Sequence, residues 1–171
     1  LMAGVIGFIV IMVFMVAMYR ICGVAADIAL VLYVALMILV LTMMNATLTL
    51  PGIAGILLSI GMAVDANVII FARIKEELQL GKSVRLAVDS GFNKAFGAII
   101  DGNVTTLIAA GVLYFFGTGL IKSFATTLIV GIMVSMFTAL VITRIVLKAF
   151  VGMNIKKPTQ YAILKKMGKE A

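Results

Sequence analysis

The chain of 171 residues is 64% hydrophobic and only 12% charged, with 14 Lys and Arg against 7 Asp and Glu. A soluble domain has nearer half apolar and a quarter charged residues, so the composition excludes a soluble globular domain and indicates an integral membrane protein. The absence of His and the single Cys exclude a histidine metal site, a histidine acid–base pair and an intramolecular disulfide.

Five apolar segments follow one another along the chain, over about 1–19, 28–44, 51–72, 97–116 and 121–147. Each is long enough for a hydrocarbon core of about 30 Å, which needs roughly 17–25 helical residues. All are expected to be helical because a helix satisfies its own backbone polar groups in lipid. The sequence therefore predicts an all-α polytopic bundle of about five transmembrane helices over residues 1–152.

The connections between these segments differ in charge. A turn over 20–27, which holds Asp27, is expected between the first two spans. Of the 14 basic residues, 13 fall at one end of the predicted helices and only Lys122 falls at the other. Lys and Arg collect in cytoplasmic loops, so the basic end is expected in the cytoplasm, with residue 1 outside and the C-terminus inside. Because the chain starts within an apolar run, we expect it to be part of a longer protein, with any extracytoplasmic domain before Leu1.

The connection between the third and fourth spans is amphipathic. Apolar residues recur at helical spacing over 82–96, with Lys82, Arg85, Asp89 and Asn93 on the other face. This pattern predicts an interfacial helix on the cytoplasmic surface, which serves either as a lipid-facing elbow or as a docking surface for a cytoplasmic partner. Residues 153–171 are expected to form a basic cytoplasmic tail or linker that touches solvent or lipid, and no nucleic acid is expected as a partner.

Small residues recur at four-residue spacing in three spans, a pattern that lets helix backbones approach closely in membranes. The stripes are Gly55, Ser59, Ala63 and Asn67 in the third span, Gly97, Asp101, Thr105 and Ala109 in the fourth, and Thr127, Gly131, Ser135, Ala139 and Thr143 in the fifth. Gly61, next to the stripe of the third span, is also expected to be a helix-packing position. The third, fourth and fifth spans are therefore expected to form the inner cluster, with the first two peripheral.

Asp65 stands inside the apolar stretch 50–72. A carboxylate in hydrocarbon costs on the order of 2.5–3.5 kcal/mol, so such residues usually face a bundle interior, a water-filled path or a partner. Asp65 lies about 200° around the helix from Ala63 and is expected to face something other than the partner of the stripe, such as a second half of the protein. Asp65 is the candidate functional residue.

Polar residues of the fourth span are expected near Asp65. At about 1.5 Å rise per residue, Asp65 lies roughly 12 Å from the boundary at Arg73, level with Thr105 and Thr106, with Asp101 and Asn103 a step closer to the cytoplasm. With Asn67 they form a candidate polar surrounding that relays protons, since a buried carboxyl group takes up a proton more readily. The alternatives are a structural acid at Asp65 and a helix-start charge at Asp101.

Several segments resemble SecD of the SecD/SecF family of protein-export membrane proteins, which belongs to the resistance–nodulation–division (RND) superfamily. The resemblance is carried by residues 48–55 (LTLPGIAG), 61–68 (GMAVDANV), 71–78 (FARIKEEL), 91–92 (GF), 101–110 (DGNVTTLIAA), 117–119 (GTG), 124–125 (FA), 135–139 (SMFTA) and 143–144 (TR). The chain departs from the usual family residues at Ala72, Gly102 and Leu120. None of these departures changes Asp65.

The resemblance implies that the chain is the second to sixth spans of the SecD half of an RND-type transmembrane domain. It implies a multi-pass protein of the bacterial or archaeal cytoplasmic membrane that assists protein export by using the proton motive force, with Asp65 as the proton-coupling residue. The implied partners are a SecF-type half, the Sec translocon, the exported unfolded polypeptide and the lipid bilayer. No enzyme activity and no cofactor other than the coupling proton are implied. An isolated chain can form a homo-oligomer through the face meant for SecF.

Two other functions fit the same span pattern. One is half of another RND transporter, for lipid or drug. The other is a non-transporting membrane scaffold for the translocon or an insertase.

Overall fold

The computed structural model describes residues 2–46 and 49–152, and every regular element in that part is helical. The elements are α1 (Met2–Tyr19), α2 (Ile21–Met43), α3 (Leu50–Gln79), α4 (Val84–Phe116), α5 (Leu120–Phe137), the π-helical η1 (Thr138–Ile142) and α6 (Thr143–Gly152). The predicted all-α class is confirmed. The tail predicted over 153–171 lies outside the described residues.

Four helical runs are long and apolar enough to cross a membrane: α2, α3, α4 and the continuous run Leu120–Gly152. In α1 the stretch Gly4–Tyr19 is apolar but shorter. The count of five spans therefore stays a prediction.

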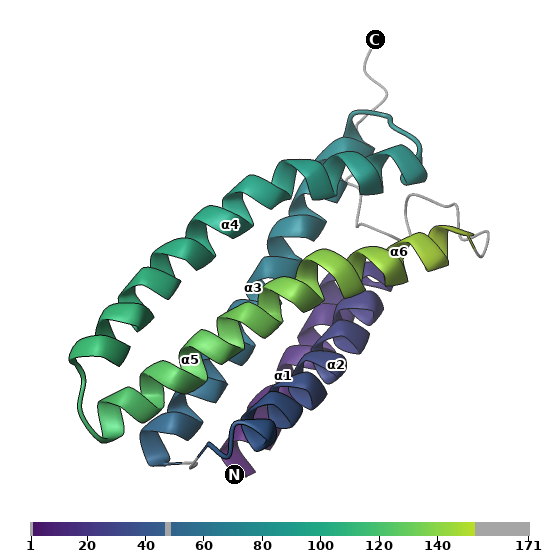
Figure 1. The fold of residues 1–171 in the computed structure, drawn as a ribbon. Helices are drawn as coiled ribbons and strands as arrows, with labels where there is room; N and C mark the ends of the chain where they lie inside the picture. Colours follow the sequence, from purple (N-terminus) through teal and green to yellow (C-terminus); the bar gives the residue numbers. More distant parts are fainter. Residues whose placement is uncertain (1, 47–48, 153–171) are drawn as a thin grey trace.

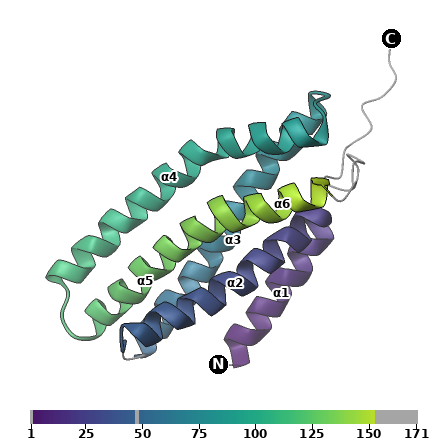
Figure 2. The same cartoon turned by 45° about the vertical axis from the view of Figure 1, so that its right-hand side comes forward.

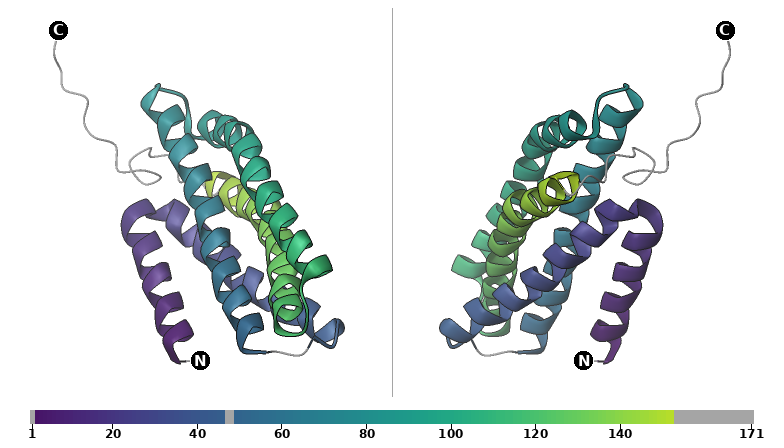
Figure 3. Two further views of the ribbon diagram at one scale, coloured as in Figure 1. Left: turned by 90° about the vertical axis from the view of Figure 1, so that its left-hand side faces the viewer. Right: turned by 90° about the vertical axis from the view of Figure 1, so that its right-hand side faces the viewer.

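The helices run up and down, so that the connections gather at two ends (Figures 1 and 2). One end holds the α1–α2 turn, the α3–α4 connection and the end of α6. We call it the basic end because Arg20, Lys82 and Lys148 lie there. The start of α1 and the α4–α5 connection lie at the opposite end. Figure 3 shows α1 at the outer edge of the bundle.

The turn between α1 and α2 is shorter than predicted. α2 begins directly after Arg20, whose φ of 49° reverses the backbone at a single residue. Gly23 lets the two helices touch, because a Cβ there would lie 2.2 Å from the Met15 carbonyl oxygen. The turn expected over 20–27 is wrong, and Asp27 instead lies about two turns inside α2.

α4 joins two elements that the sequence pattern separates. The helix predicted over about 82–96 and the span predicted over 97–116 form one helix of 33 residues, which bends along its length (Figure 1). At the basic end its apolar face packs on α3, where Gly91 allows close approach: a Cβ there would lie 2.8 Å from the Ile74 backbone nitrogen. The amphipathic segment therefore packs on the bundle as a continuation of a span.

The start of α3 is fixed by Thr49. Its side chain accepts a hydrogen bond from the Gly52 N–H (3.2 Å) and donates one to Ser123 Oγ of α5 (2.8 Å). Pro51 occupies the first turn, where a missing N–H costs nothing. This cap therefore starts the helix and ties it to α5.

α3 and α5 meet along their two small-residue stripes. A Cβ on Gly55 would lie 2.4 Å from Thr127 Oγ1, and a Cβ on Gly131 would lie 2.4 Å from Ser59 Oγ. Only small residues permit this approach of two helix backbones. Of the remaining stripe positions, Ala63, Ser135 and Ala139 are also buried.

α2 is more central than expected. Tyr33 is fully buried, and its hydroxyl lies 2.7 Å from Ser59 Oγ, within hydrogen-bond distance. Met37 is buried as well and packs near Val130 of α5. The prediction that both of the first two spans are peripheral is therefore wrong for α2.

The last predicted span contains a π-helical segment, η1. Directly after it, Thr143 donates a hydrogen bond to Asn67 Oδ1 of α3 (2.8 Å) and is within 3.3 Å of the Thr138 carbonyl oxygen. π-helical turns inside α-helices are rare and often mark functional positions. Here the segment places a buried hydroxyl against a buried amide.

Candidate functional site

Asp65 of α3 borders a small cavity between α3 and α4. The cavity has a volume of about 140 Å³, and α4 contributes Gly102, Asn103 and Thr106 to its lining. The structure thus brings Asp65 together with two of the polar residues expected beside it. Gly102 leaves room at this point, since no atom lies within 4 Å of where its Cβ would be.

The polar neighbours are held by their own helix. Asn103 donates one amide hydrogen to the Ile99 carbonyl oxygen (2.7 Å), and the Thr106 hydroxyl donates to the Gly102 carbonyl oxygen (3.0 Å). A second Asn103 amide hydrogen and the lone pairs of Thr106 Oγ1 remain. The lining therefore holds a donor suited to an ionised carboxyl and an acceptor suited to a protonated one.

Asp65 itself makes no hydrogen bond or ion pair with a described residue, and its side chain is exposed in this chain. The apolar sequence around Asp65 predicts that its side chain is buried, but the described residues do not bury it. The reason is the helix geometry noted above: the small-residue stripe is buried against α5, and Asp65 lies about 200° away from it.

Three other candidates lie away from the cavity. Asp101 and Thr105 are exposed on α4, and the Thr105 hydroxyl donates to the Asp101 carbonyl oxygen (2.9 Å). Asn67 is buried on the opposite side of α3, at Thr143. The expectation that these residues surround Asp65 is not met.

Two packing expectations need the same correction. Gly61 is exposed, and no atom lies within 4 Å of where its Cβ would be. In α4 all four stripe positions, Gly97, Asp101, Thr105 and Ala109, are exposed. α4 instead packs through a different face, on which Ile99 and Ala110 are buried.

A buried carboxylate at Glu77 was not expected from the sequence. Its side chain is fully buried at the end of α3, where it forms ion pairs with Lys82 of the connection and with Lys94 of α4 (2.5 Å). Glu77 lies beyond the apolar stretch 50–72. Hydrogen bonds from the Lys82 ammonium, which has the larger effect, and from the Lys94 ammonium hold the pKa of the Glu77 carboxyl below its usual range. The sequence did contain a signal for this burial. Glu77 falls on the same face of α3 as the apolar Ile70 and Ile74, whereas its neighbour Glu76 does not.

Replacing Glu77 with Gln is expected to lower the unfolding temperature of the subunit at neutral pH, because two ammonium groups lose their shared carboxylate. The matched control is Glu76→Gln, which removes an exposed ion pair with Arg73 and should have little effect. Because the pKa of Glu77 is lowered on folding, its contribution is present above the ordinary carboxyl range and is lost as pH falls toward the lowered value. Equal unfolding temperatures for the two variants at pH 7 would contradict this role.

Within residues 2–46 and 49–152, no three His, Cys, Asp or Glu side chains lie together as a metal site requires.

One further acid lies in a helix: the Oδ1 atom of Asp27 in α2 is buried and has no hydrogen-bond partner among the described residues.

A family model described as protein export membrane protein SecD/SecF, C-terminal, matches residues 1–152. The chain belongs to the SecD/SecF family. Its resemblance to SecD is confirmed, and the membrane helices are those of a multi-pass protein of this family.

Relatives in two bacteria support the same assignment. The chain is 56% identical over 155 residues to the protein translocase subunit SecD of Acidaminococcus fermentans, a match that covers 91% of this chain and 37% of the relative. It is 52% identical over 162 residues to the subunit SecD of Rickettsia prowazekii, covering 95% of this chain and 31% of the relative. The chain thus spans about a third of the length of these relatives.

The fold is similar to that of a solved family member. The crystal structure of SecDF from Thermus thermophilus, described as a translocon-associated membrane protein, matches with a TM-score of 0.85 and 40% sequence identity. The match covers 88% of this chain and 21% of that one. SecDF in its super-membrane-facing form matches with the same TM-score.

Proposed function

We propose that the chain is the membrane part of a SecD-type translocase subunit that uses the proton motive force to assist protein export through the Sec translocon. The observation that carries this proposal is Asp65, an acid in an apolar helix that borders a cavity shared with α4, whose lining includes the polar side chains of Asn103 and Thr106. The coupling ion is the proton, and neither an enzyme activity nor another cofactor is part of the proposal. The basic end faces the cytoplasm, in accord with the distribution of Lys and Arg.

The two sides of α3 suit different tasks. On one side the stripe through Ser59 packs tightly against α5 and carries the Asn67–Thr143 hydrogen bond. On the other side α3 and α4 leave a cavity at Asp65. A proton can drive a conformational change only if the two arrangements differ in their affinity for it. Gain of a proton at Asp65 removes a charge and adds a donor at this looser contact, so it changes how α4 sits against α3.

A SecF-type half is the proposed cover for the exposed face at Asp65. The four exposed stripe positions of α4 are small or polar, a composition that favours contact with another helix over contact with lipid. Such a cover would place Asp65 in a low-dielectric environment, where the difference between its charged and neutral forms is largest. The exported unfolded polypeptide and the translocon are the further proposed partners.

Replacing Thr106 with Val tests this site, because Val keeps the side-chain shape and removes the hydroxyl from the cavity. We expect about a fivefold fall in the proton-dependent export rate, the scale of one lost hydrogen bond between neutral groups at about 1 kcal/mol, because Thr106 Oγ1 is the acceptor for the protonated carboxyl. The measurement is export of a reporter into inverted membrane vesicles that contain the whole subunit, with and without an imposed proton gradient.

The matched control is Thr105→Val, one residue along the same helix. Thr105 bonds its own helix in the same way but is exposed outside the cavity. Val keeps the side-chain shape at the proposed contact with the second half and removes no hydroxyl from the cavity, so this replacement should change the rate by less than about twofold. Equal effects of the two replacements would overturn the cavity as the site of coupling.

A further inference from the structure

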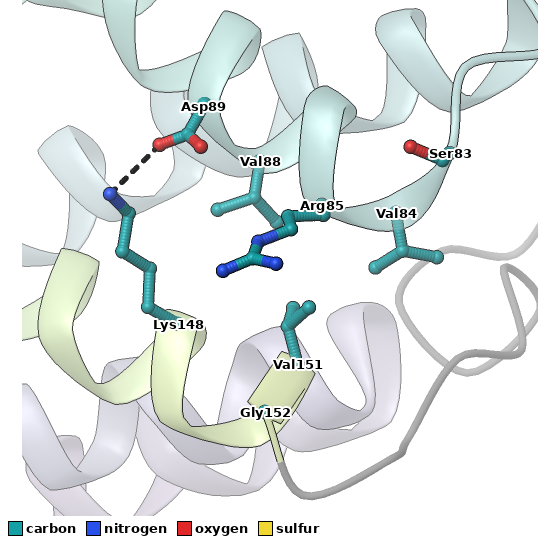
Figure 4. A pocket seen from close by; sticks show the side chains of 8 residues that line it. All are labelled: Ser83, Val84, Arg85, Val88, Asp89, Lys148, Val151 and Gly152. Atoms are coloured by element: carbon teal, nitrogen blue, oxygen red, sulfur yellow. Dashed lines mark ion pairs between the residues drawn. The ribbon is translucent and has the colours of Figure 1, made fainter.

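A larger cavity lies at the basic end, between the start of α4 and the end of α6 (Figure 4). Its volume is about 550 Å³, within the usual range for small-molecule sites. α4 contributes Val84, Arg85, Val88 and Asp89, the preceding residue is Ser83, and α6 contributes Lys148, Val151 and Gly152. This cavity is separate from the one at Asp65.

The charges around this cavity leave an excess of positive charge. Asp89 is shared by Lys148 (3.0 Å) and Arg144 (3.4 Å). Arg85 has no ion pair or hydrogen bond with a described residue, and Figure 4 shows its guanidinium lying between α4 and α6. Three cations therefore stand against one carboxylate, and the guanidinium directed into the cavity is the one that has no ion pair or hydrogen bond among the described residues.

The remaining lining is apolar. Val84 and Val88 are buried members of the main core, and Val151 of α6 packs against the same core. A soluble anion would leave this apolar surface unfilled. An amphiphile with an anionic head and a hydrocarbon chain matches both parts of the lining.

The position in the bundle also fits an amphiphile. The cavity lies where the apolar run Leu120–Gly152 ends and where α4 carries its amphipathic segment. The ends of membrane-spanning helices lie at the level of lipid headgroups, and clustered Lys and Arg there attract anionic lipids.

We propose that this cavity binds the phosphate group of an anionic phospholipid. Arg85 and Lys148 hold the phosphate, the Ser83 hydroxyl, which makes no capping bond, donates to it, and the hydrocarbon chain lies along Val84, Val88 and Val151. A guanidinium is well suited to this role because its planar donors match two phosphate oxygens. Binding at this place ties the start of α4 to the end of α6 through a lipid.

The test is a titration of the whole subunit in detergent with phosphatidylglycerol, followed by native mass spectrometry. Arg85→Gln should weaken binding about fivefold, and the double variant R85Q/K148Q roughly 25-fold, at about 1 kcal/mol for each cation near a lipid surface. Phosphatidylcholine and glycerol 3-phosphate are titrated in parallel. Both should bind much more weakly, the first because it is not anionic overall and the second because it has no hydrocarbon chain.

The matched control is the double variant R73Q/K75Q. It also removes one Arg and one Lys charge from the basic end, but at positions outside the cavity. It should bind phosphatidylglycerol as the unmodified subunit does. Equal loss in both double variants would overturn the proposal in favour of non-specific attraction. Glycerol 3-phosphate bound as tightly as the lipid would overturn it in favour of a soluble anion site. Arg85→Gln removes no ion pair or hydrogen bond with a described residue and so keeps the test valid if the double variant does not fold.

Discussion

Asp65→Asn is expected to abolish the proton-dependent part of protein export while the subunit remains folded. Asn has nearly the shape of Asp but cannot take up or release a proton in the physiological range. The described part of the fold loses no hydrogen bond or ion pair, because Asp65 makes none there and is exposed in the chain. The measurement is the difference in export into inverted vesicles with and without an imposed proton gradient, which should fall to that of vesicles without the subunit.

Asp101→Asn provides the matched control for this experiment. Asp101 is an exposed acid on α4 that does not line the cavity, so its replacement should leave most of the proton-dependent export in place. Normal unfolding temperatures for both variants would show that any loss is functional. Full proton dependence in the Asp65 variant would end the proposal that this acid couples proton flow to export.

The second large effect is expected at Gly131 of α5. A Cβ at this position would lie 2.4 Å from both Cβ and Oγ of Ser59 and 3.2 Å from the Tyr33 hydroxyl oxygen. Gly131→Ala must therefore separate α5 from α3 or break the hydrogen bond between Tyr33 and Ser59. Such overpacking costs about 1–3 kcal/mol, and Gly131→Val should cost more. Reversible unfolding in mixed detergent measures the free energy of unfolding.

Gly61→Ala is the control for the backbone effect of replacing a helical glycine. No atom lies within 4 Å of the position its Cβ would take, so only the helix propensity changes, in favour of Ala by about 1 kcal/mol. We therefore expect opposite signs for the two replacements. A destabilisation of equal size in both would show that α3 and α5 do not meet as described.

Local patterns in the sequence account for much of this fold. The helices follow from apolar runs of sufficient length, and the contact between α3 and α5 follows from small residues spaced four apart on each. The relation of Asp65 to the stripe also follows, because it depends only on the helix rotation between Ala63 and Asp65. These predictions need no knowledge of residues far away in the chain.

The features that the sequence did not predict depend on long-range contacts. The small and polar stripe of α4 has the same spacing as the buried stripes, yet it is exposed, because spacing alone does not say which neighbour a face meets. Glu77 is buried because the α3–α4 connection brings Lys82, and α4 brings Lys94, back onto the end of α3. Thr106, and not Thr105, lines the cavity at Asp65. Which of these two neighbouring residues faces Asp65 depends on how α4 is rotated against α3.

The π-helical segment η1 sets the register of everything that follows it. A π turn holds about one residue more than an α turn, so it acts as a one-residue insertion that the helix absorbs without unwinding. In an uninterrupted α-helix, α6 would be rotated by about 100°, and the side that carries Arg144 and Lys148 would turn away from Asp89. One inserted residue thus brings both the Asn67–Thr143 bond inside the bundle and the ion pairs at its end into register with the α3–α5 contact that precedes it.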